Sequence, residues 1–137
     1  MCWLFHKPKG KQVPEEYCNR AQKINKDGYG LTWFQDETVQ VFKTMDYSEF
    51  LTKLKTLDDC NVVGHLRFTS MGKTNLDNSH PFDCGNGAYM AHNGTLSSLK
   101  TVACTKTCED NSDTRNLAEV IKLCKWDRIS DVLPLVH

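Results

Sequence analysis

The sequence has no excess of either charge, because its 17 lysine and arginine residues balance its 17 aspartate and glutamate residues. A balanced chain has no electrostatic reason to bind nucleic acid or an anionic membrane, so we expect neither as a partner. No apolar run is as long as a membrane-spanning helix. The first eight residues also lack the charged start and the long apolar stretch of a signal peptide. These absences predict a cytoplasmic protein.

Cysteine pairs at zinc-finger spacing are also missing, although the chain contains seven cysteines. An odd number without a secretory signal favours reduced thiols over disulfides. Cys104 and Cys108 are separated by three residues, and Cys84 and Cys124 lie far from them in sequence, but there is no Cys-x-x-Cys pair. We therefore expect neither a metal nor another cofactor, with a zinc site as the weaker alternative.

The composition is that of an ordinary globular domain, with 39% hydrophobic and 25% charged residues. Apolar patterns and start and stop signals predict strands at 2–6, 31–34, 38–42, 61–68 and 88–92, and helices at 14–24, 47–57, 112–124 and about 127–135. The first helix carries Tyr17, Ala21 and Ile24 at helical spacing, and Asp46 or Ser48 is the expected cap of the second. This order of elements predicts a mixed α+β domain.

Five short segments carry the residues that suggest chemistry. They are Met1-Cys2, 64–72 (GHLRFTSMG), 78–82 (NSHPF), 91–96 (AHNGTL) and 112–114 (SDT). In this order and spacing they resemble the signature of the class II glutamine amidotransferases, which include glutamate synthase and glucosamine-6-phosphate synthase. Residues 25–31 resemble the segment that leads into the first hairpin of that family. The resemblance implies a single glutamine amidotransferase type 2-like domain over 1–137, with the αββα sandwich of the N-terminal nucleophile (Ntn) hydrolases.

Cys2 is the candidate nucleophile, because removal of Met1 would make it the first residue. Its α-amine, with a reference pKa of about 7.7–8.0, could then take the thiol proton directly or through a water. The sulfur would attack the side-chain amide of glutamine and form a γ-glutamyl thioester, which releases ammonia and then glutamate. Taken alone, Cys2 is more typical of a buried strand cysteine, and the other motifs reverse that preference.

The resemblance assigns the substrate contacts to Arg67, Phe68, Thr69, Ser70 and Asp113. A guanidinium at Arg67 can bind a carboxylate with two charge-assisted hydrogen bonds, and the resemblance gives it the α-carboxylate of glutamine. It gives the α-ammonium to Asp113. Each residue also has a simpler interpretation, which is an ordinary ion pair for Arg67 and a helix N-cap for Asp113.

Asn93 and Gly94 follow the last predicted strand. The Asn93 side-chain amide and the Gly94 backbone N–H can form an oxyanion hole, which is two donors directed at a tetrahedral intermediate. The same dipeptide is also common in plain hairpin turns. His80 matches a structural segment of the family, and we assign no catalytic role to it, to His65 or to His92.

Domains of this family are commonly longer, so we expect either a trimmed domain or a fragment. A missing strand would expose a sheet edge, which favours a homo-oligomer or a separate ammonia-accepting synthetase chain as partner. The favoured function is a glutaminase-type amidohydrolase. The alternatives are an inactive amidotransferase-like binding module that acts through a protein partner, and an Ntn-type hydrolase of a different amide.

Overall fold

The computed structural model describes residues 1–96 and 110–124, and these form two antiparallel sheets flanked by helices. The larger sheet has the strand order β1-β4-β2-β3 and the smaller sheet pairs β5 with β6. The strands are β1 (Trp3–Lys7), β2 (Tyr29–Gln35), β3 (Thr38–Thr44), β4 (Val62–Leu66), β5 (Phe82–Asp83) and β6 (Tyr89–Met90). The helices are α1 (Glu15–Gln22), α2 (Tyr47–Lys55) and α3 (Asp113–Leu123), with a short 3-10 turn, η1 (Leu76–Asn78).

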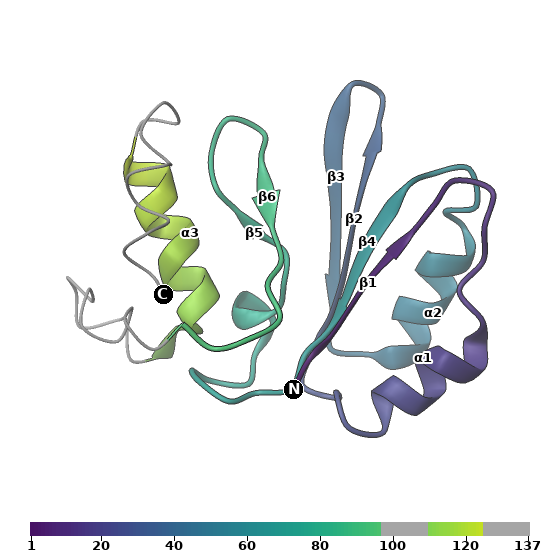
Figure 1. Ribbon diagram of the computed structural model, residues 1–137, viewed down its shortest axis with the longest axis horizontal. Helices are drawn as coiled ribbons and strands as arrows, with labels where there is room; N and C mark the ends of the chain where they lie inside the picture. Colours follow the sequence, from purple (N-terminus) through teal and green to yellow (C-terminus); the bar gives the residue numbers. More distant parts are fainter. Residues whose placement is uncertain (97–109, 125–137) are drawn as a thin grey trace.

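The elements lie in four layers (Figure 1). Helices α1 and α2 cover one face of the four-stranded sheet, the small sheet lies beyond its other face, and α3 packs on the outer side of the small sheet. The mixed α+β class predicted from the sequence is therefore confirmed. None of the helices in the described part of the chain is long and apolar enough to cross a membrane.

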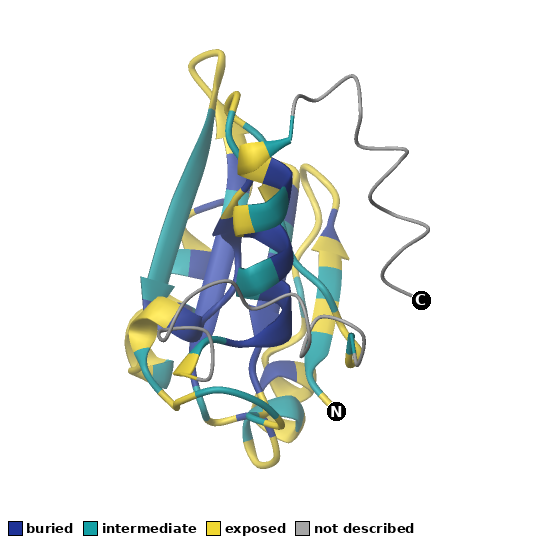
Figure 2. Ribbon diagram, turned by 90° about the vertical axis from the view of Figure 1, so that its left-hand side faces the viewer, coloured by how far each residue is buried: buried dark blue, intermediate teal, exposed yellow. Residues whose placement is uncertain are grey.

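Two hydrophobic cores hold these layers together. The larger core joins α1 and α2 to the four-stranded sheet through side chains such as Phe50, Leu31 and Val62, which are fully buried. The smaller core joins α3 to β5 through Leu117, Ile121 and their neighbours. Figure 2, which views the molecule from the α3 side, shows the buried residues gathered at its centre.

Two side-chain contacts connect the sheets. His65, on the last part of β4, stacks against His80 just before β5, and the Nζ atom of Lys43 on β3 lies 4.8 Å from the ring centre of Phe82. The contacts join residues that lie 15 and 39 positions apart in the sequence. Polar and aromatic groups therefore help to hold the small sheet against the large one in the described residues.

Most of the predicted elements are confirmed. The hairpin turns through Asp36 and Glu37, whose φ values of 51° and 60° suit the two-residue turn of a tight hairpin. Asp46 caps α2, since its carboxylate accepts hydrogen bonds from two backbone N–H groups of the first turn. The predicted helix at about 127–135 lies outside the described residues.

Two expectations from the sequence are wrong in detail. Helix α1 buries Cys18, whereas Tyr17 and Ile24 are 51% and 63% exposed. The loop between β4 and β6 was predicted without a strand, but it contains β5. A two-residue strand has too few side chains to show an alternating pattern, so its pairing with β6 could not be read from the sequence.

Candidate active site

Cys2 lies one residue before β1, where that strand meets the end of β4. The antiparallel register pairs Trp3 with Leu66, so one further step places Cys2 opposite Arg67. The Phe68 backbone N–H donates a hydrogen bond to the Cys2 sulfur at 3.3 Å, and the thiol donates to the Phe68 carbonyl at 3.4 Å. The pairing of two strands that are distant in sequence thus brings the first two predicted segments together.

Arg67 is a buried cation, with only 2% of its surface exposed. Its guanidinium donates hydrogen bonds to the carbonyls of Lys73 at 3.0 Å and Met71 at 2.8 Å, and these bonds fold the loop after β4 around it. It forms no ion pair with any carboxylate in the described residues. Burial lowers its pKa, and the nearby groups Cys2, Asp27 and Asp113 oppose this effect. The ordinary structural ion pair considered from the sequence is therefore absent from this part of the chain.

Asp27 holds the backbone that follows Arg67. Its carboxylate accepts a hydrogen bond from the Thr69 N–H at 2.7 Å, and its own N–H donates to the Arg67 carbonyl at 3.0 Å. The Thr69 hydroxyl accepts from Thr74 at 3.0 Å. Asp27 belongs to the 25–31 segment singled out in the sequence, but its role in this loop depends on a contact that no local pattern reveals.

Asp113 is the first residue of α3 and is buried. The cap of this helix is Ser112, whose hydroxyl accepts from the Arg115 N–H at 3.2 Å, so the N-cap interpretation of Asp113 is wrong. Asp113 itself has helical backbone geometry, and its carboxylate is free to accept elsewhere. One oxygen accepts from the Leu96 N–H at 2.7 Å, and the other accepts from the N–H and hydroxyl of Thr114 at 2.7 and 3.3 Å.

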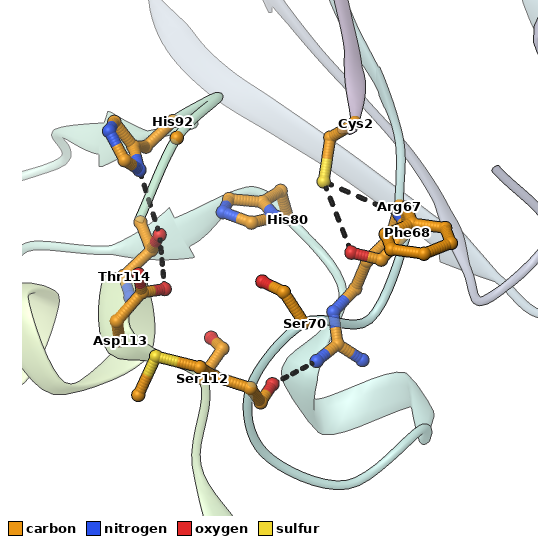
Figure 3. A pocket seen from close by; sticks show the side chains of 11 residues that line it. Cys2, Arg67, Phe68, Ser70, His80, His92, Ser112, Asp113 and Thr114 are labelled. Carbon is orange, nitrogen blue, oxygen red and sulfur yellow. Dashed lines mark hydrogen bonds between the residues drawn. The ribbon is translucent and has the colours of Figure 1, made fainter. Parts of the chain in front are cut away.

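An inner cavity brings these elements together (Figure 3). It is lined by Cys2, Arg67, Phe68, Ser70, Met71, His80, His92, Gly94, Ser112, Asp113 and Thr114. The thiol, the buried cation and the buried carboxylate therefore share one cavity, although they come from β1, the end of β4 and the start of α3. A ligand with both a negative and a positive group would find a partner for each.

An outer cavity of about 190 Å³ adjoins the inner one. Its lining consists of Met1, Cys2, Phe68, Ser70, Asn93, Gly94 and Thr95. The two cavities share Cys2, Phe68, Ser70 and Gly94, whereas Asn93 lines only the outer one. Gly94 has a φ of 159°, and a Cβ atom there would stand 2.9 Å from the His92 ring, so the close approach requires glycine.

The structure thus places most of the predicted site residues around the two cavities. Thr69 is the exception, because it lines neither cavity and its hydroxyl bonds to Thr74 instead. The sequence did not single out Met71, His92, Ser112 or Thr114 as lining residues. All four stand within or beside the recognised motifs, so proximity in sequence to a motif was the available signal.

Two buried histidines stack beside the inner cavity, and of these His80 lines it whereas His65 does not. The rings of His65 and His80 stack with centroids 3.9 Å apart at an angle of 40°. Burial lowers the pKa of His65 to about 4 and that of His80 to about 2, because a charged imidazole would lose its hydration. The His92 backbone lies near enough to His65 to offset part of this effect, yet no ring nitrogen of either histidine makes a well-formed hydrogen bond in the described residues.

Asn78 connects the two segments that carry Arg67 and Asp113. Its fully buried side chain donates to the Lys73 carbonyl at 2.9 Å and to the Asp110 carbonyl at 2.7 Å, and it accepts from the Ser112 N–H at 3.0 Å. The loop after β4 is thereby joined to the start of α3. Asn78 is the first residue of the third predicted segment, but its structural role was not foreseen.

Comparison with known proteins agrees with the geometry. The family model for the class-II glutamine amidotransferases matches residues 16–113, which is more than half of the chain. The chain is 33% identical over 86 residues to "Putative glutamine amidotransferase YafJ" of Escherichia coli, covering 57% of this chain and 34% of that protein. It is 31% identical over 85 residues to "Putative glutamine amidotransferase" of Haemophilus influenzae, covering 53% of this chain and 28% of that protein.

The chain therefore spans about a third of the length of these curated relatives. The family match covers the segments that contain Arg67, His80, Asn93 and Asp113 and begins after Cys2. Since it extends over more than half of the sequence, this chain belongs to the class-II glutamine amidotransferases.

Proposed function

We propose that this chain hydrolyses the side-chain amide of glutamine, with Cys2 as the nucleophile once Met1 has been removed. The observation that carries the proposal is the inner cavity, where a thiol, a buried carboxylate and a buried cation that forms no ion pair with any described residue lie together. A free α-amino acid has one carboxylate and one ammonium group, and a peptide-linked glutamine has neither. Family membership supports the choice of glutamine.

The family also implies the Ntn-hydrolase fold, and the four layers of helices and sheets in the described residues are compatible with it. Cys2 lies one residue before β1, which is an edge strand of the four-stranded sheet in the described residues. The family match begins at residue 16, so the proposal for Cys2 depends on its position beside the cavity.

The substrate would lie with its charged end in the inner cavity. Arg67 would bind the α-carboxylate, because the guanidinium has five N–H groups and the bonds to Met71 and Lys73 leave others to donate. Asp113 would bind the α-ammonium. Both groups are buried and fixed by their neighbours, so little ordering would be needed when glutamine binds.

The reaction would proceed in two steps, formation of a thioester and its hydrolysis. The Cys2 sulfur forms a bond to the amide carbon while its proton passes to the Cys2 α-amine. When the tetrahedral intermediate collapses, the C–N bond breaks and the same proton leaves with ammonia, which gives a γ-glutamyl thioester. A water then adds to the thioester, the C–S bond breaks, and glutamate and the free thiol are released.

Asn93 and Gly94 would stabilise the negative oxygen of each tetrahedral intermediate. Both residues line the outer cavity together with Cys2, which supports this role. Two donors directed at a developing oxyanion act on the transition state more than on the bound substrate. Phe68 and Ser70, which line both cavities, would contact the aliphatic part and the amide of glutamine.

Removal of Met1 is the condition for this mechanism. Met1 is 88% exposed, so its peptide bond to the small residue Cys2 is accessible to an aminopeptidase. Ammonia released at Cys2 would serve a synthetase on another chain or on a longer form of this protein, since the curated relatives are about three times as long as the region matched.

The test is a glutaminase assay on protein whose intact mass shows that Met1 is absent. We expect release of glutamate from glutamine, and loss of that release in the Cys2→Ala variant. Asparagine, which is one methylene shorter, is the matched control substrate. If protein without Met1 bound glutamine but released no glutamate, the binding-module function would replace the enzyme. If it bound no glutamine, both would be excluded.

A further inference from the structure

His80 is a buried polar side chain in the cavity wall that the proposed mechanism does not use. Only 4% of its surface is exposed, yet it lines the inner cavity with Cys2, Arg67 and Asp113. Figure 3 shows its ring near the middle of the group, between Cys2 on one side and the Asp113–Thr114 pair on the other. The contact of its ring with Phe82, at 4.7 Å and 61°, and its stacking on His65 fix the ring in place.

The ring nitrogens of His80 have no hydrogen-bond partner in the described residues. A neutral imidazole has one N–H donor and one nitrogen lone pair, and a buried polar atom left without a partner costs free energy. Burial keeps this imidazole neutral at cellular pH, because it lowers the pKa far below 7. The cavity wall therefore contains one fixed acceptor that carries no charge and has no partner in the described residues.

The acceptors of Asp113 are largely occupied by the protein. A carboxylate offers about four lone-pair positions, and three of them accept from the Leu96 N–H, the Thr114 N–H and the Thr114 hydroxyl. An ammonium group has three N–H bonds. Asp113 could satisfy one of them well, so a ligand held there by its ammonium needs a second acceptor from the cavity wall.

We infer that His80 is a specificity-determining residue, which accepts a hydrogen bond from the α-ammonium group of the substrate beside Asp113. This inference depends on the proposed binding of glutamine in the inner cavity. The carboxylate of the ligand has no hydrogen to donate, its methylene groups are not donors, and in the proposed binding mode its amide N–H groups lie at the other end of the molecule, beside the Cys2 sulfur. The ammonium group is therefore the natural partner for a neutral lone pair beside a buried carboxylate, and His80 selects for ligands with a free α-amine.

The experiment measures the binding of two ligands by calorimetry to Cys2→Ala protein, which cannot turn them over. One ligand is glutamine and the other is glutaramate, the same molecule without the α-amine. Adding His80→Phe keeps an aromatic ring against His65 and Phe82 but removes the nitrogen. A hydrogen bond to a charged group is worth about tenfold to a hundredfold in affinity, so glutamine binding should weaken by that factor. Glutaramate binding should change by less than about threefold on the same reasoning.

His80→Asn, which restores a short polar acceptor, should recover part of the preference for glutamine. His65→Phe is the structural control, since His65 stacks on His80 without lining the cavity, and it should affect both ligands equally. Equal weakening of both ligands in His80→Phe, or no weakening of glutamine, would overturn the inference. Failure of the Cys2→Ala parent to bind glutamine would instead overturn the proposed function.

A second measurement covers the case in which His80→Phe does not fold. Protein labelled with ¹⁵N in its histidine rings is titrated with each ligand and followed by NMR. Glutamine should shift a His80 ring nitrogen as an acceptor in a new hydrogen bond, and glutaramate should not. Identical shifts with both ligands would contradict the inference.

Discussion

Gly72 lies against the backbone of Ser112, although the two residues are 40 positions apart in the sequence. A Cβ atom built on Gly72 would stand 2.6 Å from the Ser112 nitrogen and 2.5 Å from the Asn111 carbonyl carbon. At this point the loop that surrounds Arg67 and the start of the helix that carries Asp113 thus touch backbone to backbone. The spacing between the two candidate substrate-binding charges depends on this contact and on the bonds of Asn78 beside it.

Replacing Gly72 with alanine should therefore separate the two charges. The added methyl group meets backbone atoms that cannot turn aside, and the φ of 74° is unfavourable for alanine. We expect the free energy of unfolding to fall by about 2–4 kcal/mol and glutamine binding to weaken more than tenfold. Chemical denaturation and calorimetry measure the two effects.

Gly10→Ala is the matched control. Gly10 has nearly the same φ, 70°, but no atom lies within 4 Å of the position of its Cβ. Gly10→Ala should lower the free energy of unfolding by only about 1 kcal/mol, which is the cost of the unfavourable backbone conformation, and glutamine binding should be unchanged. Equal effects of the two substitutions would mean that the contact with Ser112 does not position the site.

The roles proposed for Arg67, Asp113 and Asn93 predict different kinetic changes. Contacts made equally with substrate and transition state mainly change KM, whereas contacts made only in the transition state change kcat. Arg67→Ala and Asp113→Ala should raise KM for glutamine by a large factor, since removal of one partner from a buried charge-assisted contact costs roughly 2–5 kcal/mol. Asn93→Ala should lower kcat about 100- to 1000-fold with a smaller change in KM.

Steady-state glutaminase assays on the three variants decide between these roles. Each variant must first give a native circular dichroism spectrum, because Arg67 also holds the carbonyls of Met71 and Lys73. An unchanged kcat in Asn93→Ala together with an unchanged KM in Arg67→Ala would show that the roles are assigned wrongly.

The buried histidines predict a loss of stability in acid. The pKa of His65 is about 4 in the folded protein and near 6.5 when unfolded, so the unfolded state takes up the proton first as the pH falls. The free energy of unfolding is therefore highest above pH 6.5 and decreases between pH 6.5 and 4. His65 alone accounts for a loss of roughly 3 kcal/mol at pH 4. His65→Phe should make this part of the pH profile less steep, and the slope that remains is expected from His80, whose pKa burial also lowers.

The exposed His6 on β1 provides a control for this effect. His6→Phe introduces the same side chain in the same sheet and should leave the acid dependence as it is in the wild type. Urea unfolding at several pH values tests the difference. A profile in His65→Phe that is as steep as that of the wild type would show that His65 does not cause the loss.

Much of the fold could be predicted from local patterns, and much of the site from motif order. Apolar spacing and the Asp46 cap predicted helix α2, and the polar turn predicted the hairpin of β2 and β3. Helix α1 was placed correctly, but its packed face was not, because the sequence alone does not show whether Tyr17 or the adjacent Cys18 faces the β-sheet.

The remaining features depend on contacts between distant residues. No pattern near Asn78 shows that it bonds to Lys73 on one side and Ser112 on the other. The stacking of His65 on His80 likewise arises only when the two sheets meet. The motifs indicated which segments matter, whereas the fold determined which side chains in them line the cavities and which support the backbone.

The most direct test of the account is to find which cysteine reacts with a diazoketone analogue of glutamine. The analogue should enter the cavity by its α-amino acid end, and the attacking sulfur should displace nitrogen to form a stable thioether. The account predicts one adduct per chain, on Cys2 at the N-terminus of a protein that has lost Met1, and protection by excess glutamine. Cys60→Ala should label as the wild type does and Cys2→Ala should not label at all. An adduct on any other cysteine, or full glutaminase activity in protein that retains Met1, would contradict the account.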